Sequence, residues 1–120
     1  MNNEDTGITE AQRTAALQKI KEATVGKGPI AVVETDIEGA EFVGFRIPSS
    51  AEWTRYNIAR AGDPAQRATA GKPLVFACCA SMDAASFEAV IDAHPGLVET
   101  YIGELIEHAG ANRAKKVHKL

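Results

Sequence analysis

Residues 43–48 most constrain the fold of this chain, because the sequence changes there from strand-like to helix-like. Apolar side chains alternate with glycine and arginine from Val43 to Ile47, which is the two-residue period of a strand. Pro48 lacks a backbone amide donor and therefore ends the strand. Strand-like sequence lies before Pro48, and the patterns after it are helical. We predict an α+β fold that is mainly α, with Pro48 at the boundary between its two parts.

The helix after Pro48 has its own start signal. Ser49 and Glu52 have the spacing of a capping box, in which each side chain accepts a hydrogen bond from the other residue's backbone amide. Trp53 and Tyr56 follow three residues apart and share one face of this helix. Trp53, the only tryptophan of the chain, is therefore expected to pack between the strands and the helices.

A β-hairpin is predicted before this boundary, over about residues 30–47. Residues 30–33 are apolar, residues 42–47 carry the alternation, and Gly39 is the expected turn residue in the acidic segment between them. Two strands alone are only marginally stable in water. The hairpin must therefore rest on the helices, or be completed by a second copy or a partner.

Capping residues divide the rest of the chain into helices. Thr9 and Gln12 form a second capping box, and Asp63 followed by Pro64 is a further helix start. The segment Leu74–Ala80 is apolar on all sides, which fits a buried helix or a buried strand. We interpret it as a helix because of its alanines and helical surroundings. The other helices are expected from Thr9 to Gly26, Ser49 to about Ala61, Ala65 to about Ala70, Ser81 or Asp83 to His94, and Leu97 to Gly110.

These elements amount to a short β-hairpin followed by a small helical bundle of four to five helices. A chain of 120 residues is long enough for one domain with a modest core. We expect residues 1–8 to be a disordered leader and residues 9–111 to be a single domain, with the hairpin at about 30–47 and the helices after it at about 49–110. Residues 112–120 form a basic tail with Arg113, Lys115, Lys116 and Lys119.

Composition excludes some classes of protein. No apolar run approaches the roughly 20 residues that a membrane helix needs, so we expect no membrane association. The first five residues are polar and acidic, unlike a signal peptide, and we expect a cytoplasmic protein. A net charge of −3 does not favour nucleic acid as a partner.

The candidate reactive residues do not form a recognisable reaction centre. Cys78 and Cys79 are adjacent, whereas redox and metal sites usually separate two cysteines by two residues. His94, His108 and His118 lie in a turn, at a helix end and in the tail, without the base and orienting group that nucleophilic catalysis needs. We expect no enzyme activity, no catalytic or metal-binding residue and no cofactor.

Two charged segments allow a simple and a functional interpretation. The expected hairpin tip carries Glu34, Asp36, Glu38 and Glu41, which suit a solvated turn, an acidic docking surface or a weak cation site. The basic tail suits either a solubilising end or an arm that binds an acidic partner or nucleic acid. The residues alone thus support a small interaction module.

From Phe45 to Gly110 the order of features resembles that of the tail assembly chaperones of tailed bacteriophages. The shared features are Phe45-Arg46-x-Pro48-Ser49-x-x-Glu52-Trp53, the apolar stretch from Pro73 to Ala80, Asp83-x-x-x-Phe87, His94-Pro95-Gly96-Leu97 and an amphipathic helix that ends at Gly110. The resemblance covers a little over half of the chain. Residues 1–29 have no part in it, and the double cysteine and the long basic tail depart from it.

The resemblance implies a role without catalysis. Such chaperones bind the long, helical, aggregation-prone tape measure protein, keep it soluble and recruit tail tube subunits around it. They act in the cytoplasm of the bacterial host, and some also occur as a longer form made by ribosomal frameshifting. The expected partners are therefore the tape measure protein and the tail tube protein, with homo-oligomer formation as a further expectation.

A long helical client exposes apolar stripes, which bind in a cleft between amphipathic helices. We expect such a cleft to be formed by the last two helices and by the aromatic residues after Pro48, although each of these side chains also fits a plain core. The candidate partner-binding residues are Trp53, Tyr56, Phe87, Val90, Ile91, Leu97, Tyr101, Ile102 and Leu105.

Two other functions remain open. The chain fits a virion structural component, such as a minor tail or connector protein that forms rings, in which the hairpin is completed by a neighbouring copy. It also fits a small nucleic-acid-binding regulator that uses the basic tail.

Overall fold

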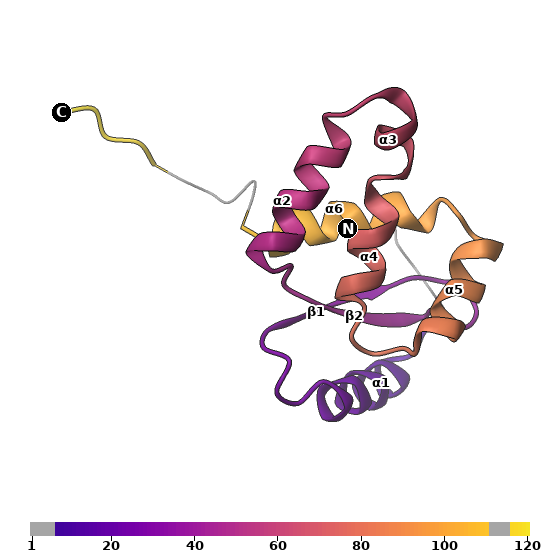
Figure 1. Ribbon diagram of the computed structural model, residues 1–120. Coiled ribbons are helices and arrows are strands. Elements are labelled where there is room, and N and C mark those ends of the chain that lie inside the picture. Colours follow the sequence, from indigo (N-terminus) through magenta and orange to yellow (C-terminus); the bar gives the residue numbers. More distant parts are fainter. Residues whose placement is uncertain (1–6, 111–115) are drawn as a thin grey trace.

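The computed structural model describes residues 7–110 and 116–120 and confirms the mainly α-helical α+β fold (Figure 1). Residues 1–6 of the expected leader, and Arg113 and Lys115 of the tail, lie outside the described residues. Within the described chain, one helix precedes a two-stranded antiparallel hairpin and five helices follow it. The elements are α1 Glu10–Ala23, β1 Ile30–Glu34, β2 Phe42–Arg46, α2 Ser50–Arg60, α3 Pro64–Thr69, α4 Gly71–Cys78, α5 Ala84–Ala93 and α6 Leu97–His108.

The hairpin has the predicted position and turn. Val32 pairs with Gly44 at its centre, and the amide of Ala40 donates to the carbonyl of Ile37 at 2.9 Å. Gly39 has φ +88°, a conformation that glycine adopts without strain. Because side chains alternate between the two faces of a strand, one face of the hairpin meets the later helices and the other meets α1.

Helix α1 covers the face of the hairpin opposite to α4 and α6 (Figure 1). The predicted capping box of Thr9 and Gln12 is present at its start. Arg13 binds both carboxylate oxygens of Glu34 at 2.7 and 2.9 Å, which joins α1 to β1. Ile20 is its one buried residue. Ile20, the bidentate ion pair and the hydrogen bond from Lys27 to the carbonyl of Ala80 all attach this layer to the rest of the protein.

The corner after β2 is built as predicted. Ser49 and Glu52 form the capping box of α2, with hydrogen bonds of 2.8 and 3.2 Å. Arg46 also donates to both carboxylate oxygens of Glu52 at 2.8 and 2.7 Å, and to the carbonyl of Ala77 at 2.8 Å. One arginine therefore joins the end of β2, the start of α2 and the end of α4.

The apolar segment Leu74–Ala80 is a helix only as far as Cys78. Cys79 is extended and forms an antiparallel bridge with Phe45, while the amide of Ala80 donates to the carbonyl of Gly44 at 2.8 Å. The hydroxyl oxygen of Ser81 accepts a hydrogen bond from the amide of Gly44. The N-cap of α5 is therefore Asp83 and not Ser81. By leaving the helix, the chain provides hydrogen-bond partners for the backbone groups of Gly44 on the outer edge of β2.

The predicted interruption at Gly71–Pro73 is shorter than expected. Gly71 is already the first residue of α4, and only Ala70, itself in the helical region, separates α3 from α4. Pro73 lies in the first turn of α4, where its missing amide removes no helical hydrogen bond. Asp63 caps α3 with Pro64 behind it, as predicted.

Three aromatic residues from three elements form the centre of the core. The ring of Phe45 lies 4.7 Å from that of Tyr101 and 6.1 Å from that of Phe87, measured between centroids. All three side chains are fully buried. Helices α4 and α6 pack on each other beside this cluster. The other buried members of the core are Val33, Ala40, Val43, Leu74, Val75, Cys78, Ile91, Leu97 and Leu105.

Candidate binding groove

The nine candidate partner-binding residues divide into two groups. Five are buried core residues, with at most 8% of the residue surface exposed: Phe87, Ile91, Leu97, Tyr101 and Leu105. Of these, Ile91 also lines the groove described below. Trp53, Tyr56, Val90 and Ile102 are half-buried at the edge of the core. The first group belongs to the core cluster, in which Phe87 and Tyr101 contact the ring of Phe45. The second group leaves apolar surface in reach of solvent.

Helix α6 is apolar over two adjacent stripes. Leu97, Tyr101 and Leu105 recur every four residues and face the core. Val98, Ile102 and Ile106 recur at the same spacing, one position later, and are only half-buried. Residues four apart on a helix lie on the same face. The second stripe is therefore a continuous apolar surface that the rest of the described chain covers only in part.

This second stripe is the floor of a groove with a volume of about 790 Å³. We call it the α6 groove. Its opposite side is formed by the end of α2, by α3 and by the start of α4, and Tyr56 lines it from α2. The remaining residues that line it are Arg60, Arg67, Ala68, Thr69, Ala70, Gly71, Lys72, Ile91, Asp92, Pro95, Glu99 and Gly103.

The close approach of α4 to α6 depends on Gly71. A Cβ atom at this position would lie 2.9 Å from Cγ1 of Ile102 and 3.3 Å from Cγ1 of Val98. Any larger residue would therefore push the start of α4 away from the second stripe. The small side chains of Ala68 and Ala70 continue this narrow side of the groove.

Charged side chains line both sides of the α6 groove. Arg60, Arg67 and Lys72 lie on the α2–α4 side, which we call the basic wall. Asp92 and Glu99 lie on the α5–α6 side, which we call the acidic wall. All five are exposed. The apolar floor thus lies between charged residues on two sides of the groove.

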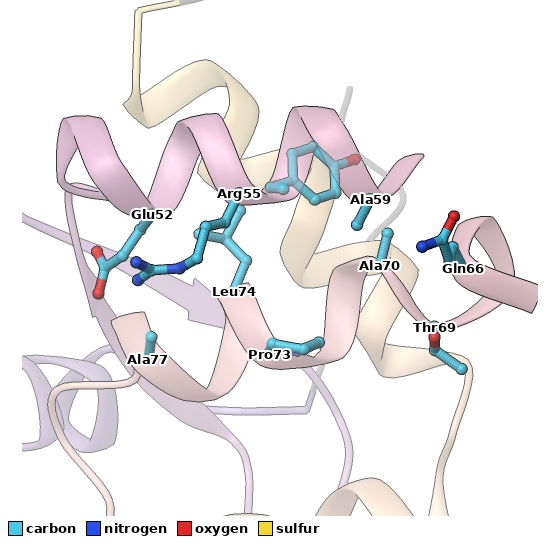
Figure 2. Close-up of a pocket in the computed structure, with 10 residues that line it drawn as sticks. Glu52, Arg55, Ala59, Gln66, Thr69, Ala70, Pro73, Leu74 and Ala77 are labelled. Carbon is cyan, nitrogen blue, oxygen red and sulfur yellow. The ribbon is translucent and has the colours of Figure 1, made fainter. Parts of the chain in front are cut away.

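A smaller groove lies between α2 and α4 (Figure 2), with a volume of about 320 Å³. Figure 2 shows Leu74 and Pro73 of α4 below Ala59 and Arg55 of α2. Its carboxylate, Glu52, is already bound by Arg46 and by the amide of Ser49. Tyr56 lines this groove and the α6 groove. The smaller groove therefore adds apolar surface next to the larger one.

The reactive residues do not meet in either groove. Cys78 is buried and Cys79 is half-buried beside β2, and both are free thiols. Within residues 7–110 and 116–120, no three His, Cys, Asp or Glu side chains lie close enough together to hold a metal ion. In the acidic hairpin tip, Glu34 is bound by Arg13 and Glu41 accepts the amide of Gly39, while Asp36 and Glu38 are exposed.

Most residues of the α6 groove were absent from the sequence-based candidates. Val98 and Ile106 belong to the apolar pattern of the last helix, but that pattern does not separate the core stripe from the groove stripe. The basic wall comes from segments that precede Val98 by more than 20 residues in the sequence, so spacing gives no signal for it. The sequence does contain one signal for the groove. The apolar face of α6 is wider than the single stripe of residues that packs against the core.

Comparison with known proteins found no match among family models, curated proteins or solved structures. In the part of the chain that the structure describes, no helix has the length and apolar character needed to cross a membrane.

Proposed function

We propose that this protein is a tail assembly chaperone that binds apolar helical segments of a tape measure protein and keeps them soluble. The observation that supports this function best is the second apolar stripe of α6, Val98, Ile102 and Ile106, at the floor of a large open groove. Apolar surface that lines an open groove is a candidate binding site for an apolar segment.

The mode of binding is that of a helix in a groove. The client helix places its own apolar stripe on the second stripe of α6, and both are removed from water. Tyr56 at the edge of the groove combines a large apolar ring with a polar end, a common property of interface anchors. The same proposal includes recruitment of tail tube subunits, action in the host cytoplasm and the absence of catalysis.

Co-expression tests this function. The full chain is produced together with the tape measure protein of the same phage, and the soluble fraction of the tape measure protein is compared with that of cells without the chain. We expect a clear rise that survives high salt, because burial of apolar surface depends little on ionic strength. An unchanged soluble fraction would contradict the proposal.

A truncated chain that ends at residue 111 separates the chaperone from the regulator with a basic tail. If the tail binds nucleic acid, DNA affinity falls steeply with added salt and disappears in the truncated chain. A chaperone that uses the α6 groove retains its client after the truncation. Loss of solubilisation with the tail would place the client site there instead.

A ring-forming virion component is the second candidate, and the outer edge of β1 favours it. The amide of Gly44 donates a hydrogen bond to the hydroxyl of Ser81, and its carbonyl accepts one from the amide of Ala80. Both bonds lie on the side of β2 away from β1. Val32, the partner of Gly44 in the register, therefore also directs its backbone groups away from the hairpin. They bond to no described residue, and a strand of a neighbouring copy fits there. A monomer at high concentration by light scattering would contradict this candidate.

A further inference from the structure

The walls of the α6 groove carry charges that no ion pair neutralises within residues 7–110 and 116–120. Arg13 and Arg46, elsewhere on the surface, are each paired with a carboxylate at 2.7 Å. By contrast, none of the five charged residues of the two walls forms an ion pair with another described residue. The basic and acidic walls thus line the same groove, and neither has a partner of opposite charge among the described residues.

The basic wall is held in place by its neighbours. The guanidinium of Arg60 lies 5.4 Å from the ring centroid of Tyr56, and the ammonium of Lys72 lies 5.5 Å from that of Phe76. Arg67 donates to the carbonyl of Gly62 at 3.0 Å. These contacts orient the cations and leave their charge in place, so a carboxylate that enters the groove finds them positioned.

Gly103 gives a second and independent observation. It lies inside α6 and lines the groove, and a Cβ atom built on it meets no atom within 4 Å. A glycine inside a helix destabilises it by about 1 kcal/mol relative to alanine. The close packing that explains Gly71 does not apply to Gly103. An exposed glycine on the wall of a groove allows a partner backbone to approach the helix closely.

From these observations we infer that the occupant of the α6 groove is an amphipathic helix with one acidic and one basic flank, which crosses α6 most closely at Gly103. The inference rests on the proposed function and adds the chemistry of the client segment. The acidic flank lies against the basic wall, the basic flank lies against the acidic wall, and the apolar stripe lies on Val98, Ile102 and Ile106.

The length of the groove suits such a helix. The floor runs from Val98 to Ile106, a rise of eight residue steps or about 12 Å along α6. This is about two helical turns, enough for three or four apolar side chains of a partner at spacings of three and four residues. Charges on both sides of an apolar floor match the two polar flanks of one helix, since those flanks lie on either side of its apolar stripe.

Three synthetic helices test the inference. They are 18-residue peptides with the same leucine stripe and with flanks that are Glu and Lys, Glu and Glu, or Lys and Lys. Their affinities for the full chain are measured by fluorescence anisotropy at low and high salt. We expect the Glu and Lys peptide to bind about three- to tenfold more tightly than the other two at low salt, because it forms ion pairs with both walls. Salt should reduce this difference.

Charge reversal on each wall gives the matched variants. R67E/K72E should increase affinity for the Lys and Lys peptide, and D92K/E99K should increase it for the Glu and Glu peptide. K19E/K21E on α1 is the control for R67E/K72E, because it changes the net charge by the same amount at two exposed residues outside the α6 groove. This control should leave the order of the three peptide affinities unchanged.

A bulky residue at the crossing point tests the geometry. Gly103→Leu should weaken all three peptides at least tenfold. Gly96→Leu is its control, because Gly96 has φ −65°, has no atom within 4 Å of a built Cβ and lies outside the α6 groove. Circular dichroism checks that both variants fold.

The outcomes separate this inference from the proposed function. Equal affinities of the three peptides for the unmodified chain, or binding of none, would overturn the inference whatever the variants do. If the peptides bind in the expected order but the tape measure protein stays insoluble on co-expression, the groove has the inferred specificity and the chaperone proposal is wrong.

Discussion

Gly71 and Ile102 are in contact where α4 crosses α6, at a distance that leaves no room for a side chain on residue 71. A Cβ there would lie 2.9 Å from Cγ1 of Ile102, closer than carbon atoms pack. This contact sets the distance between the narrow side of the α6 groove and its floor. The shape of the groove therefore depends on one glycine, whose role differs from that of the exposed Gly103 on the neighbouring helix.

Substitution of Gly71 by alanine should destabilise the protein by about 1–2 kcal/mol. The added methyl group overpacks the crossing, and the gain in helix propensity offsets only part of that effect. Gly103→Ala is the matched control, since its methyl group enters open space, and it should stabilise the protein by up to about 1 kcal/mol. Urea denaturation of both variants measures the difference. Equal effects of the two substitutions would show that the crossing is loose.

The ion pair of Arg46 and Glu52 should make stability depend on pH in the acid range. The hydrogen bonds from Arg46 and Ser49 lower the pKa of Glu52 from its ordinary value of 4.5 to about 2. Because the folded-state pKa is lowered, this contribution is complete above about pH 4.5 and is lost as the pH falls toward 2. We expect a loss of about 1–2 kcal/mol for this partly exposed pair.

Glu52→Gln tests the assignment of this pH dependence. The amide oxygen of the variant still accepts the amide of Ser49, but the side chain no longer titrates. The variant should therefore be less stable than the parent at pH 6 and should lose less stability between pH 4.5 and 2. An equally steep loss in the variant would mean that other carboxylates cause it. Urea denaturation across this pH range is the measurement.

The sequence predicted local structure well because caps and turns depend on few neighbouring residues. Ser49 with Glu52, Thr9 with Gln12, Asp63 with Pro64, and Gly39 in its turn all have the predicted roles. The segment up to Ala80 was predicted only in part. Its last residues pair with β2, because Gly44 needs partners that no local pattern reveals.

The site was harder to predict than the fold. Tyr101 and Ile102 are adjacent in one apolar pattern, yet the first is fully buried and the second lines the α6 groove. The difference in burial between Tyr101 and Ile102 depends on how β2 and α4 pack around α6. Phe45 of β2 packs on Tyr101, and Gly71 of α4 lies against Ile102. Arg67 and Lys72 also show no local pattern that links them to α6. Such relationships are set by tertiary packing, which the spacing of residues does not encode.

Tyr101→Phe should leave stability unchanged or raise it by up to about 1 kcal/mol. The hydroxyl of Tyr101 is buried and has no hydrogen-bond partner in the described structure, and burial raises the pKa of Tyr101 to about 12. Removing an unpaired buried polar group eliminates its desolvation penalty, while the ring contacts with Phe45 remain. Thermal unfolding measures the effect. A destabilisation above 1 kcal/mol would indicate that a bound water satisfies the hydroxyl.

The two thiols should react at different rates. Burial raises the pKa of Cys78 to about 11 and also raises that of Cys79, so both are poor nucleophiles at neutral pH. Cys78 is fully buried and Cys79 is half-buried. We expect Cys79 to react slowly with a thiol reagent in the folded protein, and Cys78 to react only after unfolding. Single Cys→Ser variants assign the two rates, and rapid labelling of Cys78 in the native state would contradict its core position.

Ile106→Glu tests most directly whether the second stripe of α6 binds the client. The measurement is the soluble fraction of the tape measure protein co-expressed with this variant. Ile106 is a half-buried floor residue of the α6 groove. Ile58→Glu is the matched control, because Ile58 is 67% exposed on α2 and lines none of the grooves described above. We predict that the control keeps the client as soluble as the unmodified chain does, and that folded Ile106→Glu does not. Full solubilisation by folded Ile106→Glu would show that the second stripe does not bind the client.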